Sequence, residues 1–243
     1  MKEPYTELAF AYDYILRHVD YDQWYRYLRT LIFQYMRDPG PILELGCGTG
    51  KFGAKFSKDD FEIYGMDKSV DMLRVARARA FRNFRIFCGD MTRFSLARQF
   101  DFIFSVHDTM NYFLTLRELA KVLRCVRAAM HAKSVFMFDV TTEHNILTYF
   151  DGRVTRYTIR GTEVEWSNTY DKRKKQVVST LEFKRKGVPF AVEAHVQRIY
   201  SKKEVSALLA KEGFKVLDVY GDYTFSPPGA DTVMMNFVTR RTR

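Results

Sequence analysis

The 243-residue sequence predicts an α/β fold: a doubly wound, seven-stranded, mostly parallel sheet with an inserted antiparallel β-sheet lid. Between residues 42 and 140, short apolar runs alternate with helical patterns, as in a parallel sheet covered on both faces. Residues 150–200 instead show strand-like alternation broken by turn residues, without a convincing helix. One more helix and a last pair of strands then close the chain.

The elements of the core are predicted in chain order from periodicity and capping residues. An amphipathic helix over 20–37 repeats apolar residues at i, i+3, i+4 and i+7, and the Pro-Gly-Pro of 39–41 ends it. Ser69 caps a later helix that extends to about residue 80, and Thr115 and Ser201 begin capping boxes. The predicted core strands are 42–44, 61–67, 84–87, 100–106, 134–140, 216–223 and 232–239.

The insertion divides the chain into two expected units. We expect residues 1–148 and 201–243 to form the sheet domain, with a helical cap at the N-terminus, and residues 149–200 to form the lid. This length suits one domain with an insertion better than two equal domains. The candidate strands of the lid are 153–159, 162–170, 176–184 and 190–200.

The segment 42–50, ILELGCGTG, is a buried strand that ends in Glu44 and opens into a glycine-rich turn. The glycines also satisfy the G-x-G-x-x-G dinucleotide pattern, so spacing alone leaves NAD possible. A dinucleotide places an anionic pyrophosphate at this turn, where a carboxylate would repel it. S-adenosylmethionine has no phosphate and carries a positive sulfonium and a positive ammonium. Glu44 therefore favours S-adenosylmethionine at Gly46 and Gly48, and a plain tight turn is the alternative.

Further acidic residues follow the next two strands. Asp67, followed by Lys68, stands about 20 residues after the turn, where an acid binds ribose hydroxyls in nucleoside sites. Asp90 follows the third strand and is placed to accept from an adenine amino group, with Met91 over the ring. Alone, Gly-Asp at 89–90 is an ordinary turn; in series with the other acids it completes one pocket.

This series resembles the class I S-adenosylmethionine-dependent methyltransferases, and the resemblance covers nearly the whole chain. The segments 5–14, 21–24 and 108–112 are similar to those of a prokaryotic small-molecule subfamily. Its layout is similar to that of the sugar N-methyltransferases and glycine N-methyltransferase. The resemblance implies that residues 107–112 lie beside the sulfonium and the acceptor. Tyr112 stands where the sugar enzymes often have a histidine.

The resemblance implies roles for individual side chains in three groups. The expected catalytic residues are Tyr12, His107 and Tyr112. Further cofactor contacts are expected from Tyr12, Trp24 and Val106. Substrate contacts are expected from Asp108 and Asn111 and, because of their places on strand faces of the insertion, from Trp166 and Arg198, the last of which would suit an anionic group. Packing in the core or on the surface is the alternative for the aromatic residues and for the two lid residues.

Composition and charge limit the possible partners, cofactors and cellular location of the protein. The net charge of +10 is concentrated between Arg74 and Arg85 and from Arg153 to Lys203, which keeps RNA open as a partner. Three unevenly spaced cysteines argue against a disulfide framework and suit a cytoplasmic protein, and no ligand spacing suggests a metal. No apolar run is long enough to span a membrane. We expect a monomer or homodimer that methylates a nitrogen or oxygen of a small molecule. The alternatives are an RNA methyltransferase and a non-catalytic S-adenosylmethionine-binding protein.

Overall fold

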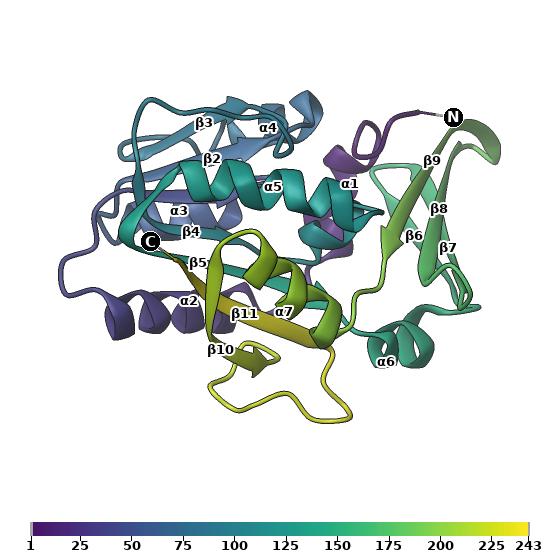
Figure 1. Cartoon of the computed structure of the whole chain (residues 1–243). Coiled ribbons are helices and arrows are strands. Elements are labelled where there is room, and N and C mark those ends of the chain that lie inside the picture. Colours follow the sequence, from purple (N-terminus) through teal and green to yellow (C-terminus); the bar gives the residue numbers. More distant parts are fainter. Residues whose placement is uncertain (1, 243) are drawn as a thin grey trace.

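A computed structural model describes residues 2–242 and confirms the predicted fold class (Figure 1). The strands of the larger sheet are β1 (Ile42–Leu45), β2 (Ile63–Asp67), β3 (Phe84–Cys88), β4 (Phe100–Ser105), β5 (Met130–Thr141), β10 (Phe214–Gly221) and β11 (Met234–Arg241). Their order is β10-β11-β5-β4-β1-β2-β3. The neighbours from β3 to β5 pair in parallel, whereas β11 is antiparallel to both β5 and β10. The predicted closing strand pair is therefore confirmed.

The helices predicted from periodicity and capping are present, with differences at their ends, and η1, α6 and η2 occur where none was predicted. They are α1 (Leu8–Ile15), α2 (Tyr21–Tyr35), α3 (Lys51–Lys58), α4 (Val70–Ala76), η1 (Thr109–Tyr112), α5 (Leu116–Ala128), α6 (Glu143–Asn145), η2 (Ile146–Phe150) and α7 (Lys202–Lys211). Both capping boxes are present, at Thr115 and Ser201. The helix that Ser69 caps ends at Ala76, earlier than predicted. Among the helices of residues 2–242, none has both the length and the apolar character of a membrane span.

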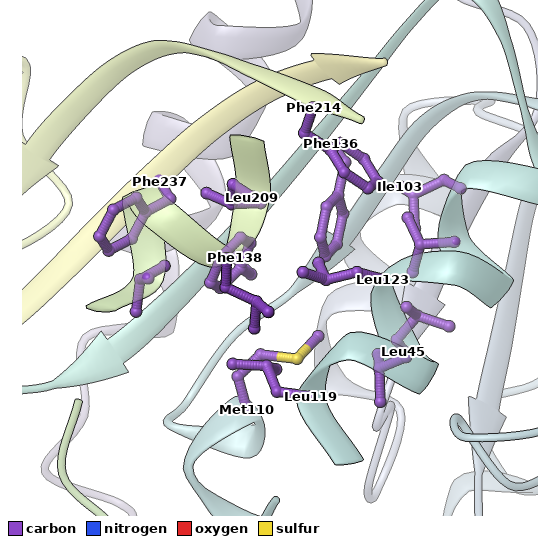
Figure 2. Packing of buried hydrophobic residues seen from close by; sticks show 14 of the residues in the cluster. Leu45, Ile103, Met110, Leu119, Leu123, Phe136, Phe138, Leu209, Phe214 and Phe237 are labelled. Carbon is purple, nitrogen blue, oxygen red and sulfur yellow. The ribbon is translucent and has the colours of Figure 1, made fainter. Parts of the chain in front are cut away.

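Each face of the larger sheet is covered by its own set of helices. Alternate residues of β1 point to opposite faces. Leu43 and Leu45 join the apolar cluster beneath α5 and α7, which Figure 2 shows around Phe136 and Phe138. Ile42 joins the cluster beneath α2 and α3. Glu44 has the same parity as Ile42, so its side chain points toward the second set of helices.

The second sheet, which we call the lid sheet, is a four-stranded antiparallel meander inserted between β5 and α7 (Figure 1). Its strands are β6 (Val154–Ile159), β7 (Thr162–Asp171), β8 (Gln176–Arg185) and β9 (Val188–Arg198). The prediction that the last strand reaches residue 200 is wrong. The chain leaves the sheet after Arg198, because the Ile199 N–H donates to the Lys175 carbonyl (2.8 Å) and the Tyr200 hydroxyl donates to the Phe113 carbonyl.

The N-terminal segment connects the lid sheet to the larger sheet. Helix α1 packs Leu8, Ala11 and Ile15 against apolar residues of the lid sheet. The far end of the same helix carries Asp13, which accepts a hydrogen bond from the Thr49 hydroxyl in the glycine turn (2.7 Å). The N-terminal cap is therefore an arm that joins the two sheets across the carboxyl ends of the parallel strands.

Candidate active site

The glycine turn after β1 has the conformation that its sequence predicts. Gly46, Gly48 and Gly50 have φ values of 73°, 52° and 77°, in the left-handed region that favours glycine. A Cβ on Gly46 would lie 2.6 Å from the Thr109 Cγ2 atom, so no larger residue fits there without displacement. The N–H groups of Gly46 and Cys47 both donate to the Met66 carbonyl (2.8 and 3.0 Å). The backbone is thus fixed in a shape that a ligand can approach closely.

Glu44 is a buried acid at this turn with an unsatisfied oxygen. It is 2% exposed, and within residues 2–242 its Oε2 atom has no hydrogen-bond partner. Burial raises the pKa of the carboxyl group well above its usual range, against one backbone hydrogen bond from Gly53. An unsatisfied buried carboxylate oxygen is costly unless a donor or a positive charge meets it. The residue therefore fits the positive end of S-adenosylmethionine.

Asp67 lies at the end of β2, directly beside the glycine turn. Its Oδ2 atom accepts the Gly48 N–H and its Oδ1 atom accepts the Ser69 N–H, both at 2.8 Å. Burial raises the pKa of the carboxyl group. Each oxygen keeps a further acceptor position, as ribose hydroxyls require. Lys68, the next residue, has an exposed side chain.

Asp90 and Met91 follow β3 at the same edge. The Thr92 N–H and hydroxyl donate to Asp90 Oδ1 at 2.9 and 2.7 Å, so this carboxylate stabilises the turn formed by residues 90–92. The Met91 Cε atom lies 3.4 Å from where a Cβ on Gly46 would be, which places this side chain against the glycine turn. A role for the pair at an adenine ring stays a prediction.

A buried carboxylate that the sequence analysis did not single out organises the end of β4. His107 and Asp108 are consecutive non-glycine residues in the left-handed region, with φ values of 65° and 51°. Asp139 of β5 accepts both of their N–H groups, at 2.7 and 2.8 Å, and also accepts the Tyr223 hydroxyl. Such strained positions persist where the surrounding structure holds them, often at functional sites. Asp139 follows an apolar run at a strand's carboxyl end, the same signal that revealed Asp67.

Three residues predicted near the cofactor and acceptor meet at this point. The Trp24 ring stacks on Tyr223, with centroids 3.9 Å apart, and its edge approaches His107 at 5.3 Å. The Tyr12 ring lies 6.2 Å from His107. Burial lowers the pKa of His107 to about 4, so its imidazole is neutral at pH 7. Val106, just before this group, is buried.

The next residues connect the larger sheet to the lid sheet. Burial, together with the charge of Asp139, raises the pKa of Asp108 to about 8. Both ends of the Asn111 amide bind backbone groups, since it donates to the Arg198 carbonyl (2.7 Å) and accepts the Thr141 N–H (3.0 Å). The Tyr112 hydroxyl lies 2.9 Å from Nδ1 of His195 on β9.

The two lid residues predicted to contact substrate do not join this cluster. The Trp166 indole donates to the Asn168 side chain (2.9 Å), and its ring packs in the apolar cluster around α1. The Arg198 guanidinium pairs with Glu204 of α7 (2.9 Å) and lies over the Tyr200 ring. Substrate contact by these two residues stays a prediction. Within residues 2–242, no group of three or more His, Cys, Asp or Glu is placed to hold a metal ion.

Comparison with known proteins defines the class to which this geometry belongs. Residues 42–133 match the family described as a methyltransferase domain, which spans the glycine turn, Asp67 and Asp90. The fold is that of an S-adenosylmethionine-dependent methyltransferase from Clostridium acetobutylicum, with a TM-score of 0.84, 21% identity and coverage of 98% of this chain and 99% of the other. Residues 42–133 therefore form a methyltransferase domain, and the whole chain has the fold of S-adenosylmethionine-dependent methyltransferases, with S-adenosylmethionine as the cofactor that the site fits.

Two further proteins are similar to nearly the whole chain. It is 26% identical, over 98% of its length and 99% of the relative's, to a protein of Geobacillus sp. (strain WCH70) named "Putative methyltransferase". The sugar N-methyltransferase KedS8 from Streptoalloteichus sp. shares the fold, with a TM-score of 0.78, 17% identity and coverage of 96% and 93% of the two chains. The identities are low, so residue roles in this chain depend on its own geometry.

Proposed function

We propose that this protein transfers a methyl group from S-adenosylmethionine to a nitrogen or oxygen of a small molecule, and that an amine nitrogen is the favoured acceptor. The observation that carries the proposal is the contact between the lid sheet and the segment after β4. Tyr112 meets His195 at 2.9 Å, and the Gln197 amide donates to the Asp108 carbonyl at 3.3 Å. The acceptor is bound beside this contact, where the lid sheet covers the segment after β4, and such cover favours a small molecule over folded RNA.

The charges near this contact favour an amine. Asp108, Asp139 and Glu193 are acidic, and the last two are fully buried. An ammonium group that approaches these carboxyl groups favours their ionised forms, which then stabilise the positive charge that develops on a nitrogen as it is methylated. The sugar N-methyltransferase that shares this fold supports an amine acceptor as well.

Part of the basic surface that suggested RNA is already neutralised. Arg79 pairs with Asp13 (2.7 Å), and Arg85 pairs with Glu62 (2.8 Å). Both arginines belong to the cluster between Arg74 and Arg85. With Arg74, which pairs with Asp71, three of its cations are engaged within the protein, which disfavours a phosphate-binding face.

A labelled-methyl screen tests the proposal. The purified protein and methyl-labelled S-adenosylmethionine are incubated in parallel with fractionated metabolite extract and with total RNA. We expect label in amine-containing metabolite fractions, absent with an Asp67→Ala control. Label in RNA alone would favour the RNA alternative, and no label in either, with cofactor binding intact, would favour a non-catalytic binding protein.

A further inference from the structure

Four polar side chains form a continuous hydrogen-bond chain at the base of the lid sheet. The Tyr5 and Tyr112 hydroxyls lie 2.6 Å apart, and Tyr112 lies 2.9 Å from His195 Nδ1. The other ring nitrogen, Nε2, lies 3.2 Å from Glu193 Oε2. His195 and Glu193 are 4% and 0% exposed. The chain joins three segments that are far apart in the sequence: the N-terminal arm, η1 and β9.

The surroundings of Glu193 fix the direction of the hydrogen bonds. Its Oε1 atom accepts the N–H groups of Glu7 and Leu8, and Oε2 accepts the Tyr5 N–H (3.0 Å). Since the carboxylate acts as an acceptor, His195 Nε2 carries a hydrogen and Nδ1 presents a lone pair. Tyr112 then donates to Nδ1 and Tyr5 donates to Tyr112. The Tyr5 oxygen is left with a free lone pair.

We propose that Tyr5, Tyr112, His195 and Glu193 form a proton relay that removes a proton from the acceptor nitrogen, an inference that rests on the proposed function. The acceptor's lone pair forms a bond to the methyl carbon of bound S-adenosylmethionine while the methyl–sulfur bond breaks and its electron pair goes to sulfur. The acceptor's proton passes to the Tyr5 oxygen, the Tyr5 proton to Tyr112 and the Tyr112 proton to His195 Nδ1. Both tyrosines end neutral, and an imidazolium faces a carboxylate. The arrangement follows the logic of a nucleophile, a base and an orienting acid.

The roles in the relay differ with position. Tyr5 is the catalytic residue, because its ring centroid lies 5.9 Å from that of Tyr12. Tyr12 and Trp24 are aromatic residues beside His107. Tyr112, His195 and Glu193 are positioning residues. The charged or titratable groups that face the His195 ring are Glu193 on its own strand, Tyr112 from η1 and Tyr5 edge-on at 4.8 Å. Burial is the main cause of the raised pKa of both tyrosines, and Asp108 adds to it; Asp108 is also the competing base.

The first test is nuclear magnetic resonance of the full-length, ¹⁵N-histidine-labelled protein with S-adenosylhomocysteine bound. His195→Gln assigns the signal by deleting it. We expect the His195 ring to carry its single hydrogen on Nε2, opposite Glu193. Glu193→Gln places an amide opposite Nε2 and should shift the ring toward Nδ1–H. An Nδ1–H tautomer in the wild-type protein would overturn the relay, because no lone pair would then face Tyr112.

The second test is a double-mutant cycle with the acceptor that the labelled-methyl screen returns. Tyr112→Phe and His195→Gln should each lower kcat about 100-fold, the double variant should lose little more, and S-adenosylhomocysteine affinity should be unchanged. Tyr14→Phe, an exposed tyrosine of α1, is the matched control. The relay would be refuted if the losses of kcat in the two single variants multiplied in the double variant. It would also be refuted if Asp108→Asn shifted the dependence of kcat on pH and His195→Gln did not. Methylation by a protein whose His195 is in the Nδ1–H tautomer would refute the relay but not the proposed function. The Nε2–H tautomer without methylation of any acceptor would refute the proposed function and, with it, the role of the relay.

Discussion

The cofactor half and the acceptor half of this site are built in different ways. The cofactor half, Glu44 to Asp67, comes from one continuous β-α-β segment, and its carboxylates are held by backbone N–H groups. The acceptor half joins Tyr5, Tyr112 and His195, whose hydrogen bonds span 107 and 83 residues of sequence. Cofactor recognition is therefore a local property of the chain, whereas acceptor chemistry depends on how the lid sheet and the N-terminal arm dock.

The largest effect is expected in the cofactor half, from Asp67→Ala. The substitution removes the acceptor of the Gly48 and Ser69 N–H groups together with the proposed ribose contact. The proposed ribose contact consists of two hydroxyl hydrogen bonds to a charged group. At roughly 1.5–3 kcal/mol each, their loss corresponds to a loss of cofactor affinity of about 100-fold or more. Calorimetry with S-adenosylhomocysteine measures it. Asp71→Ala on α4 is the control and should bind normally, and unchanged binding by Asp67→Ala would refute the ribose assignment.

Glu44→Gln should separate binding from stability within the same half. The amide removes a buried group whose charged form is disfavoured, so the ligand-free protein should melt about 2–4 °C higher, which corresponds to about 1 kcal/mol. Affinity for S-adenosylmethionine should fall about 10-fold. A larger loss for S-adenosylmethionine than for S-adenosylhomocysteine would locate the contact at the sulfonium, and equal losses would locate it at the ammonium. A lower melting temperature with normal binding would contradict both assignments.

The difference between the halves explains what the sequence revealed. Glu44 and Asp67 were predictable because each ends an apolar strand beside a glycine turn, and parallel strands bring such ends to one edge. Asp139 carried the same signal but stands in a strand whose partner groups, His107 and Tyr223, are distant in sequence. The closing strands were predicted, but their pairing beside β5, which brings Tyr223 to Asp139, is a long-range contact that no local pattern shows.

In the lid sheet, the sequence predicts which residues share a strand face but not what that face contacts. The strand alternation of residues 190–200 puts Glu193 and His195 on one face of β9, where both side chains are buried. It did not reveal that this face meets Tyr5 and Tyr112, because docking is set by long-range packing of α1 against the lid sheet. Asn111 was expected to contact substrate, yet backbone groups occupy both ends of its amide.

In the acceptor half, Asp108→Asn should change the pH dependence of stability. The folded pKa of about 8 lies above the usual unfolded value of about 3.9, so the folded state holds this proton more tightly. The stabilisation is present at low pH and is lost as pH rises from about 4 to about 8. The variant has no proton to lose at this position, so it does not lose this stability as pH rises. The difference in melting temperature, variant minus wild type, should therefore rise by a few degrees between about pH 5 and pH 8. Asp38→Asn, on the exposed surface, should show no such trend, and a constant difference for Asp108→Asn would contradict its burial as an acid.

The smallest effect is expected where the two halves are joined, from Asp13→Asn. Asp13 holds α1 against the glycine turn through the Thr49 hydroxyl and the Arg79 guanidinium, both at 2.7 Å. The group is partly exposed, so the loss of stability should stay within about 1 kcal/mol. If the arm retains the bound cofactor, S-adenosylhomocysteine should dissociate a few-fold faster in stopped-flow measurements, and added salt should shift the wild type toward the variant. Asp22→Asn, which breaks a surface pair with Lys55, is the matched control. Equal dissociation rates in all three proteins would show that the arm joins the two sheets without retaining the cofactor, and acceptor chemistry would then be its sole contribution.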